Sequence, residues 1–132
     1  MNQYKINLAK VIDGDTVDVD INLGFDILLK NKRIRLAGID APETRTKDLI
    51  EKEFGLFVKQ KVIDFISGNF ENMTLKVYDE NDKFGRILGD IYCNGNSLCE
   101  YLLNNKYVVK YNGENKDNIK SLHLENMKLI NL

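Results

Sequence analysis

The chain has 132 residues, of which 43% are hydrophobic and 30% are charged. This composition excludes a disordered or collagen-like chain, and the length suits one compact domain, so we expect residues 1–132 to form a single domain. With 19 Lys and Arg against 20 Asp and Glu, the formal net charge is −1. The chain therefore lacks the excess of positive charge that is typical of nucleic-acid-binding proteins.

Three antiparallel strands are predicted within the first 40 residues. Residues 17–21 read VDVDI and alternate apolar with acidic side chains, as in a strand with one buried face. Turn-forming residues separate the predicted strands at 13–15, 22–24 and 31–32. The expected strands are 4–13, 16–30 with a bend or break near Gly24, and 32–39.

An amphipathic helix is predicted next, over residues 51–68, with Gly68 as its C-terminal stop. Its apolar residues recur at intervals that place them on one helical face. They are Phe54, Phe57, Val58, Val62, Phe65 and Ile66. We expect this face to pack against the core.

Two further strands are predicted at 73–78 and 86–93, separated by a turn at 79–82. Ser97 and Glu100 have the spacing of a capping box, which predicts the start of a short helix. Both the strands and this helix are consistent with a mixed, mainly β domain.

The last segment is predicted to contain a loop and a helix. Residues 112–116 are polar, and Asp117 is the expected cap of a helix that runs to about Lys128. The full order is then β-β-β-α-β-β-α-α. It predicts an α+β, mainly β fold, namely a five-stranded OB-fold barrel with three helices.

The sequence IRLAGIDAPET at 34–44 holds two carboxylates around the only proline of the chain. Pro42 fixes its own φ angle and keeps Ala41 out of the helical region, so the strand must end there. Asp40 and Glu43 then project from a rigid turn at the edge of a sheet. The alternative is a polar turn that merely leads into a helix.

Two other motifs combine charged residues with glycine. In VIDGDTV, residues 11–17, Asp15 follows a glycine that permits a turn or bulge, although Asp-Gly is also a common hairpin signal. In DKFGR, residues 82–86, Gly85 permits a turn before Arg86, and a charged hairpin loop is the alternative.

Together the motifs contain the groups that metal-assisted phosphodiester hydrolysis needs. Asp15 and Asp40 offer oxygen ligands, which a hard cation such as calcium requires. Glu43 can activate water, while Arg35 and Arg86 can bind the phosphate and its developing charge.

The sequence lacks the residues that other kinds of hydrolytic site require. His123 is the only histidine, which excludes histidine-rich zinc sites and two-histidine mechanisms. We expect it to be a surface or packing residue of the last helix. Neither a Gly-x-x-x-x-Gly-Lys phosphate loop nor a Gly-x-Ser-x-Gly sequence occurs.

Signals for localisation are sparse. No apolar stretch reaches the roughly 18–20 residues of a transmembrane helix, and Lys5 and Lys10 interrupt the N-terminal apolar segment, so no secretory signal is predicted. Cys93 and Cys99 are expected to be free thiols in a reducing compartment. We expect a soluble cytoplasmic protein with no membrane contact, or a secreted one if a signal was removed.

The motifs resemble those of the staphylococcal nuclease (thermonuclease-like) family. The resemblance covers nearly the whole chain through VIDGDT (11–16), IRLAGIDAPET (34–44), the helix after EKEFG, DKFGR (82–86) and SLCEYLLNNKYV (97–108). It implies an OB-fold barrel that uses one Ca²⁺ ion to cut DNA and RNA by attack of water on phosphorus, leaving 3′-phosphates. We expect single-stranded substrates to be preferred and the protein to be a monomer.

The resemblance also implies a role for each residue. Glu43 would orient or deprotonate the attacking water, Arg35 would bind and polarise the phosphate, and Arg86 would stabilise the transition state and the leaving oxygen. The calcium ligands would be Asp15, Asp40 and the carbonyl oxygen of Ala41. The contacts to base and sugar would come from Lys83, Phe84 and Tyr111.

This chain departs from the best-known member of the family at three points. Ala41 replaces a threonine, Phe84 replaces a tyrosine, and the net charge is slightly negative instead of strongly positive. Fewer phosphate contacts predict a higher Michaelis constant and a flatter salt dependence. The alternative function is a non-catalytic OB-fold module that binds nucleic acid or protein, but such a module has no need of the complete set of acidic and arginine residues.

Overall fold

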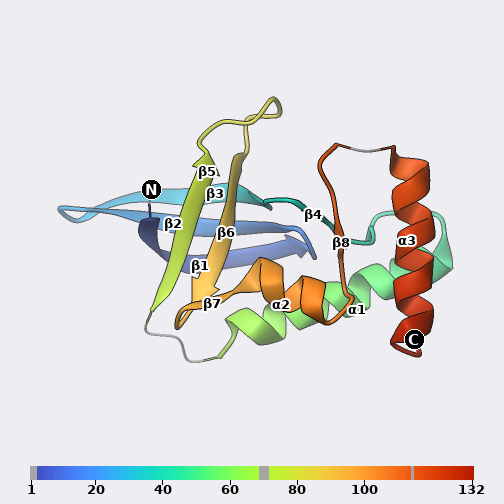
Figure 1. The fold of residues 1–132 in the computed structure, drawn as a ribbon. Coiled ribbons are helices and arrows are strands. Elements are labelled where there is room, and N and C mark those ends of the chain that lie inside the picture. Colours follow the sequence, from blue (N-terminus) through green and yellow to red (C-terminus); the bar gives the residue numbers. More distant parts are fainter. Residues whose placement is uncertain (1–2, 69–71, 114) are drawn as a thin grey trace.

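The computed structural model describes residues 3–68, 72–113 and 115–132. Neighbouring strands of its main sheet run antiparallel in the order β3-β2-β1-β5-β6, and parallel pairing of residues 34–36 with 87–89 closes the sheet into a barrel (Figure 1). The five strands are β1 (Gln3–Asp13), β2 (Thr16–Gly24), β3 (Ile27–Leu36), β5 (Met73–Asp79) and β6 (Ile87–Cys93). The predicted five-stranded OB-fold barrel is confirmed.

In the described part of the chain three helices accompany the barrel, as predicted: α1 (Leu49–Ile66), α2 (Leu98–Asn104) and α3 (Lys116–Leu129). Figure 1 shows α1 and α2 along one side of the barrel and α3 beyond the strand β8. The short strands are β4 (Ile39–Asp40) and β8 (Val109–Lys110), which pair with each other, and β7 (Asn96–Ser97), which pairs with β6. The β4–β8 pair therefore joins the end of the barrel to the segment that leads into α3.

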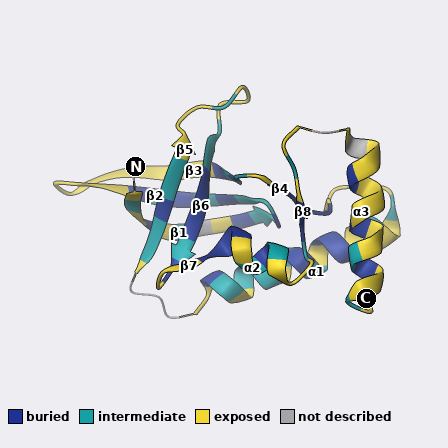
Figure 2. Ribbon diagram, in the orientation of Figure 1, coloured by how far each residue is buried: buried dark blue, intermediate teal, exposed yellow. Residues whose placement is uncertain are grey.

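The core lies inside the barrel and beneath α1 (Figure 2). Along β2, buried and partly exposed residues alternate from Thr16 to Ile21, which confirms the strand pattern predicted from VDVDI. Helix α1 contributes one buried face to the same core, with side chains spaced about one turn apart. These side chains are Phe54, Val58, Val62 and Ile66.

The second and third strands differ from the prediction in their boundaries. The hairpin turn lies at Phe25 and Asp26, whose φ angles of 57° and 61° suit a two-residue turn. Asn31, predicted to end a strand, instead has a φ angle of 53° and forms an irregularity within β3. Its backbone N–H donates a hydrogen bond to Asp20 Oδ1 at 2.9 Å, so β3 continues to Leu36.

The ends of helices α1 and α3 also differ from the prediction. Helix α1 begins at Leu49 and is capped by Asp48, and it ends at Ile66, before the predicted stop at Gly68. Helix α3 is capped by Asn115 instead of Asp117, because the Asn115 side chain accepts a hydrogen bond from the backbone N–H of Asp117. The predicted loop at 112–116 includes residue 114, which lies outside the described residues.

The predicted cap of α2 is confirmed. Ser97 Oγ accepts a hydrogen bond from the backbone N–H of Glu100 at 3.1 Å. Cys93 and Cys99 are free, as expected, and both are buried. Burial raises the pKa of both thiols, that of Cys93 to about 11, so neither is a reactive thiolate near neutral pH. Within the described ranges, no helix combines the length and hydrophobicity that crossing a membrane requires.

Candidate active site

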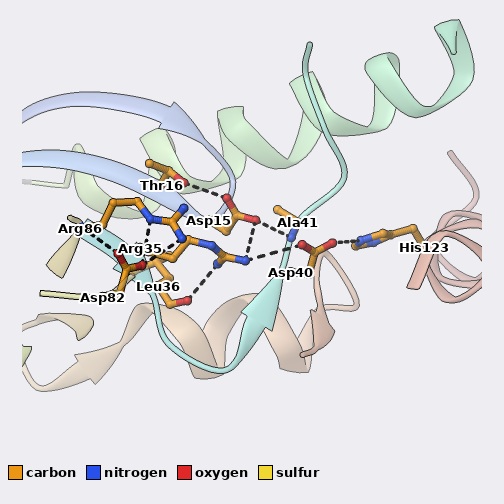
Figure 3. Close-up of polar contacts among 9 residues, drawn as sticks. All are labelled: Asp15, Thr16, Arg35, Leu36, Asp40, Ala41, Asp82, Arg86 and His123. Carbon is orange, nitrogen blue, oxygen red and sulfur yellow. Dashed lines mark hydrogen bonds and ion pairs between the residues drawn. The ribbon is translucent and has the colours of Figure 1, made fainter. Parts of the chain in front are cut away.

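Most of the charged residues singled out in the sequence meet in one pocket of about 230 Å³ beside the β1–β2 turn. Figure 3 shows Asp15, Arg35, Asp40 and Arg86 of this group. They come from the β1–β2 turn, from β3, from β4 and the loop after it, and from the residue before β6. Six of the predicted residues line it: Asp15, Arg35, Asp40, Ala41, Glu43 and Arg86. The fold therefore brings together residues as far apart in the sequence as Asp15 and Arg86.

Asp15 is held in place by hydrogen bonds from two directions. Its Oδ2 accepts one from the backbone N–H of Ala41 at 2.9 Å, and its Oδ1 accepts one from Thr16 Oγ at 3.0 Å. Gly14 does form the predicted hairpin turn, but it also allows close packing, since a Cβ there would lie 2.7 Å from Val58 Cγ1. The predicted turn is confirmed, and Asp15 faces the pocket as the site prediction requires.

Asp40 is nearly buried, with 6% of its surface exposed. Its backbone pairs with Val109 of β8, and its Oδ2 lies 2.9 Å from Nε2 of His123 on α3. One guanidinium nitrogen, Arg35 Nη2, lies 3.6 Å from Asp40 Oδ1 and 3.5 Å from Asp15 Oδ2. Arg35 therefore compensates the repulsion between two carboxylates that face the same pocket.

Glu43 lies exposed on the rigid turn that follows β4. Two contacts fix this turn. The hydroxyl of Thr44 donates a hydrogen bond to Asp13 Oδ1, and a Cβ at Gly55 of α1 would lie only 2.4 Å from the carbonyl oxygen of Glu43. Glycine at position 55 therefore lets α1 support the backbone of the turn directly.

Arg86 is held almost entirely by its own loop. Asp82 accepts hydrogen bonds from the backbone N–H of Arg86 at 2.8 Å, from its Nε at 3.0 Å, and from the backbone N–H of Phe84 at 2.9 Å. These bonds, led by the one from the Arg86 backbone, hold the pKa of Asp82 below its usual value. Gly85 takes the left-handed conformation that the turn requires, with φ of 76°.

A second pocket of about 570 Å³ adjoins the first and shares Arg35 and Arg86 with it. Phe84 is 68% exposed there, and the Arg86 guanidinium lies 5.0 Å from the centre of its ring. The three residues predicted to contact base and sugar all line this pocket: Lys83, Phe84 and Tyr111. The structure therefore gathers both predicted sets of residues in adjacent pockets.

The carboxylates of the first pocket are the donor type that a hard divalent cation requires. Asp15 and Asp40 present carboxylate oxygens to a single nitrogen of Arg35 at 3.5 and 3.6 Å, so the two groups converge. Among the described residues there is no group of three or more His, Cys, Asp or Glu side chains suited to a metal ion. A cation here would depend on two carboxylates completed by backbone carbonyl and water oxygens, which calcium accepts.

The role of one residue beside the pocket, His123, was foreseen only in part from the sequence. His123 was expected at the surface or in packing; it is buried and packs edge-on against Phe54, but it also contacts Asp40. Its burial could have been foreseen, because Ile119, His123 and Met127 recur at intervals of four. Its partner, 83 positions away, could not.

The protein is thus an OB-fold barrel with one pocket at its end that is lined by two converging aspartates, an exposed glutamate and two arginines. Residues 33–128 match the family described as staphylococcal nuclease homologue. Because that match covers more than half of the chain, the chain belongs to this family, and the resemblance found in the motifs is confirmed. Asp15 lies before the matched residues, and the structure places it in the pocket.

Similar proteins occur in plants and bacteria. The chain is 39% identical over 80 residues to the probable staphylococcal-like nuclease CAN1 of Oryza sativa subsp. japonica, covering 61% of this chain and 22% of that protein. It is 33% identical over 89 residues to the micrococcal nuclease of Shigella flexneri, covering 67% and 42%. It is 29% identical over 105 residues to the endonuclease YncB of Bacillus subtilis (strain 168), covering 77% and 47%. The matched part of this chain thus spans less than half the length of these relatives.

Proposed function

We propose that this chain is a nuclease that hydrolyses phosphodiester bonds of DNA and RNA by calcium-assisted attack of water and leaves 3′-phosphates. One observation carries the proposal: Asp15, Asp40, Glu43, Arg35 and Arg86 line a single pocket. Membership of a family with nuclease-named relatives supports it.

The acidic residues would serve the cation and the water. Asp15, Asp40 and the Ala41 carbonyl oxygen would hold calcium, which supplies positive charge to the phosphate and lowers the pKa of water when bound. Glu43 is exposed at the same pocket, so its carboxylate can reach a water molecule there and orient it or accept its proton.

The two arginines would serve the phosphate. Arg35 lies partly buried between the two aspartates, where its guanidinium can bind a nonbridging phosphate oxygen. Arg86 lines the same pocket, where Asp82 holds its Nε and Nη2, and its remaining nitrogen, Nη1, can meet the charge that develops on the leaving oxygen.

The adjoining pocket suits one nucleotide of a single strand. The exposed ring of Phe84 offers a stacking surface to a base, and Lys83 and Tyr111 border the same space. Stacking on an aromatic side chain requires an unpaired base, so we propose that the chain, acting as a monomer, prefers single-stranded substrates.

The test is to incubate the chain with denatured DNA in calcium, in magnesium and in a chelator of divalent cations. We expect cutting in calcium and none in the chelator. Cutting that persists in the chelator would contradict the proposed chemistry. Binding of the DNA without cutting in any of the three conditions would instead support the non-catalytic module.

A further inference from the structure

His123 is an unexpected polar residue on the buried face of α3. Its neighbours on that face are Ile119 and Met127, which are apolar. Its Nδ1 is buried and has no hydrogen-bond partner in the described part of the chain. Burying an imidazole with an unsatisfied nitrogen costs free energy that a leucine at this position would not. The ring is therefore poorly explained by packing alone.

The contact with Asp40 explains why a buried imidazole occupies position 123. His123 Nε2 lies 2.9 Å from Asp40 Oδ2, and both side chains are at most 8% exposed. An ionised carboxylate only accepts hydrogen bonds, so opposite an ionised Asp40 the ring nitrogen Nε2 is the donor. Figure 3 shows the ring on the far side of Asp40 from Arg35, which faces the other carboxylate oxygen.

The geometry limits how the carboxylate can turn. With Oδ2 bound to His123, Oδ1 is the oxygen directed toward Arg35 and the pocket that Asp15 also faces. The ring itself is restrained, because its edge packs against Phe54 with ring centres 6.4 Å apart at 77°. The His123 side chain thus links helix α3 to Asp40.

We propose that His123 is a positioning residue of the cation site: its hydrogen bond orients Asp40 so that Oδ1 can bind the divalent cation. The inference rests on the proposed calcium site. Hydrogen bonds to a ligating carboxylate from a second residue preorganise it, and their loss typically weakens metal binding by about 10- to 100-fold.

The test compares calcium dissociation constants from titration calorimetry of the whole chain and three variants. His123→Leu keeps an apolar side chain against Phe54 but removes the donor, and we expect about tenfold weaker binding. His123→Gln keeps an N–H donor at a similar distance from the backbone and should restore most of the affinity. Ile119→Val loosens the same helix face but keeps the His123 side chain, and should lower the melting temperature without changing calcium affinity.

A measurement on the unsubstituted chain covers the case in which His123→Leu does not fold. His123 is the only histidine, so nitrogen-15 labelling of histidine yields a single imidazole in the NMR spectrum. Its Nε2–H resonance should shift when calcium is added.

The outcomes separate the two proposals. If the unsubstituted chain binds no calcium, the cation site itself is rejected, and the role of His123 with it. If that chain binds calcium but His123→Leu binds it equally well, or the imidazole resonance does not move, only the positioning role is overturned. Equal weakening in Ile119→Val and His123→Leu also overturns it, because loss of helix docking would then explain the effect.

Discussion

The two halves of the candidate site are held by different kinds of contact. The carboxylate half, Asp15, Asp40 and Glu43, is fixed by partners far away in the sequence, such as the Ala41 N–H on Asp15 and His123 on Asp40. The arginine loop, residues 82–86, is fixed by Asp82 through bonds that span at most four residues. One half therefore depends on the whole fold, and the other on a short stretch of chain.

The difference predicts how each half responds to change. A perturbation of packing around the barrel should disturb the carboxylates and leave the arginine loop intact. A substitution within the loop should alter the placement of Arg86 while barely changing global stability, because exposed local contacts contribute little to it.

The largest effect is expected from removing one chemical group in each half. Glu43→Gln should lower turnover by about 10²- to 10⁴-fold through loss of the group that activates water. Arg86→Ala should lower it by about 10²- to 10³-fold through loss of charge stabilisation. The measurement is cleavage of denatured DNA in calcium.

Asp18→Asn is the matched control for that pair, because Asp18 is a carboxylate of β2 that pairs with Arg33 on the outside of the barrel. We expect unchanged turnover in this variant. Full activity of Glu43→Gln would remove Glu43 from the mechanism.

The next effect tests the long-range support of the carboxylate half. In an ordinary helix interior, Gly→Ala stabilises by about 1 kcal/mol, but a Cβ at Gly55 would lie 2.4 Å from Glu43 O. Gly55→Ala should therefore destabilise the chain, by about 1–3 kcal/mol in urea unfolding, and should also reduce turnover. A stabilised variant with full activity would show that α1 does not support the turn.

A smaller effect is expected from the local half. Asp82→Asn removes the charged acceptor of Arg86 and should reduce turnover while lowering the melting temperature by a small, measurable amount at pH 6. Because the folded-state pKa of Asp82 lies below its usual value, its contribution is present above that usual value and is lost as the pH falls through the folded-state pKa. The stability difference between the unsubstituted chain and the variant should therefore be smaller at pH 2 than at pH 6. A constant difference would show that Asp82 does not titrate in this way.

The smallest effect is expected on the affinity for single-stranded DNA, from a lysine of the arginine loop. Lys83→Ala removes one cation beside the second pocket, and should reduce the slope of log affinity against log salt for single-stranded DNA by about 0.7. Lys30→Ala, on β3 at an exposed position paired with Asp20, is the control and should leave the slope unchanged. Equal slopes for all three chains would place the bound strand away from Lys83.

Much of the fold could be predicted because its signals are local. The alternation of VDVDI, the helical spacing of the apolar residues in α1 and the Ser97 cap each depend on residues within one element. The errors arose where two local signals competed. Asn31 can serve a turn or a bulge, and Asn115 and Asp117 can each cap α3; pairing with Asp20 and the start of the helix decided these cases.

The candidate site also has features that local sequence signals predict and features that depend on tertiary contacts. The sequence by itself determined the rigid turn at Pro42, the DKFGR loop and the residue types that suit phosphodiester chemistry. Only the tertiary structure decided that α1 touches Glu43 at Gly55 and that α3 places His123 on Asp40. Turns and caps arise from the backbone preferences of a few neighbouring residues, whereas a contact across 83 positions exists only once the barrel and α3 have packed and set the distance between two side chains.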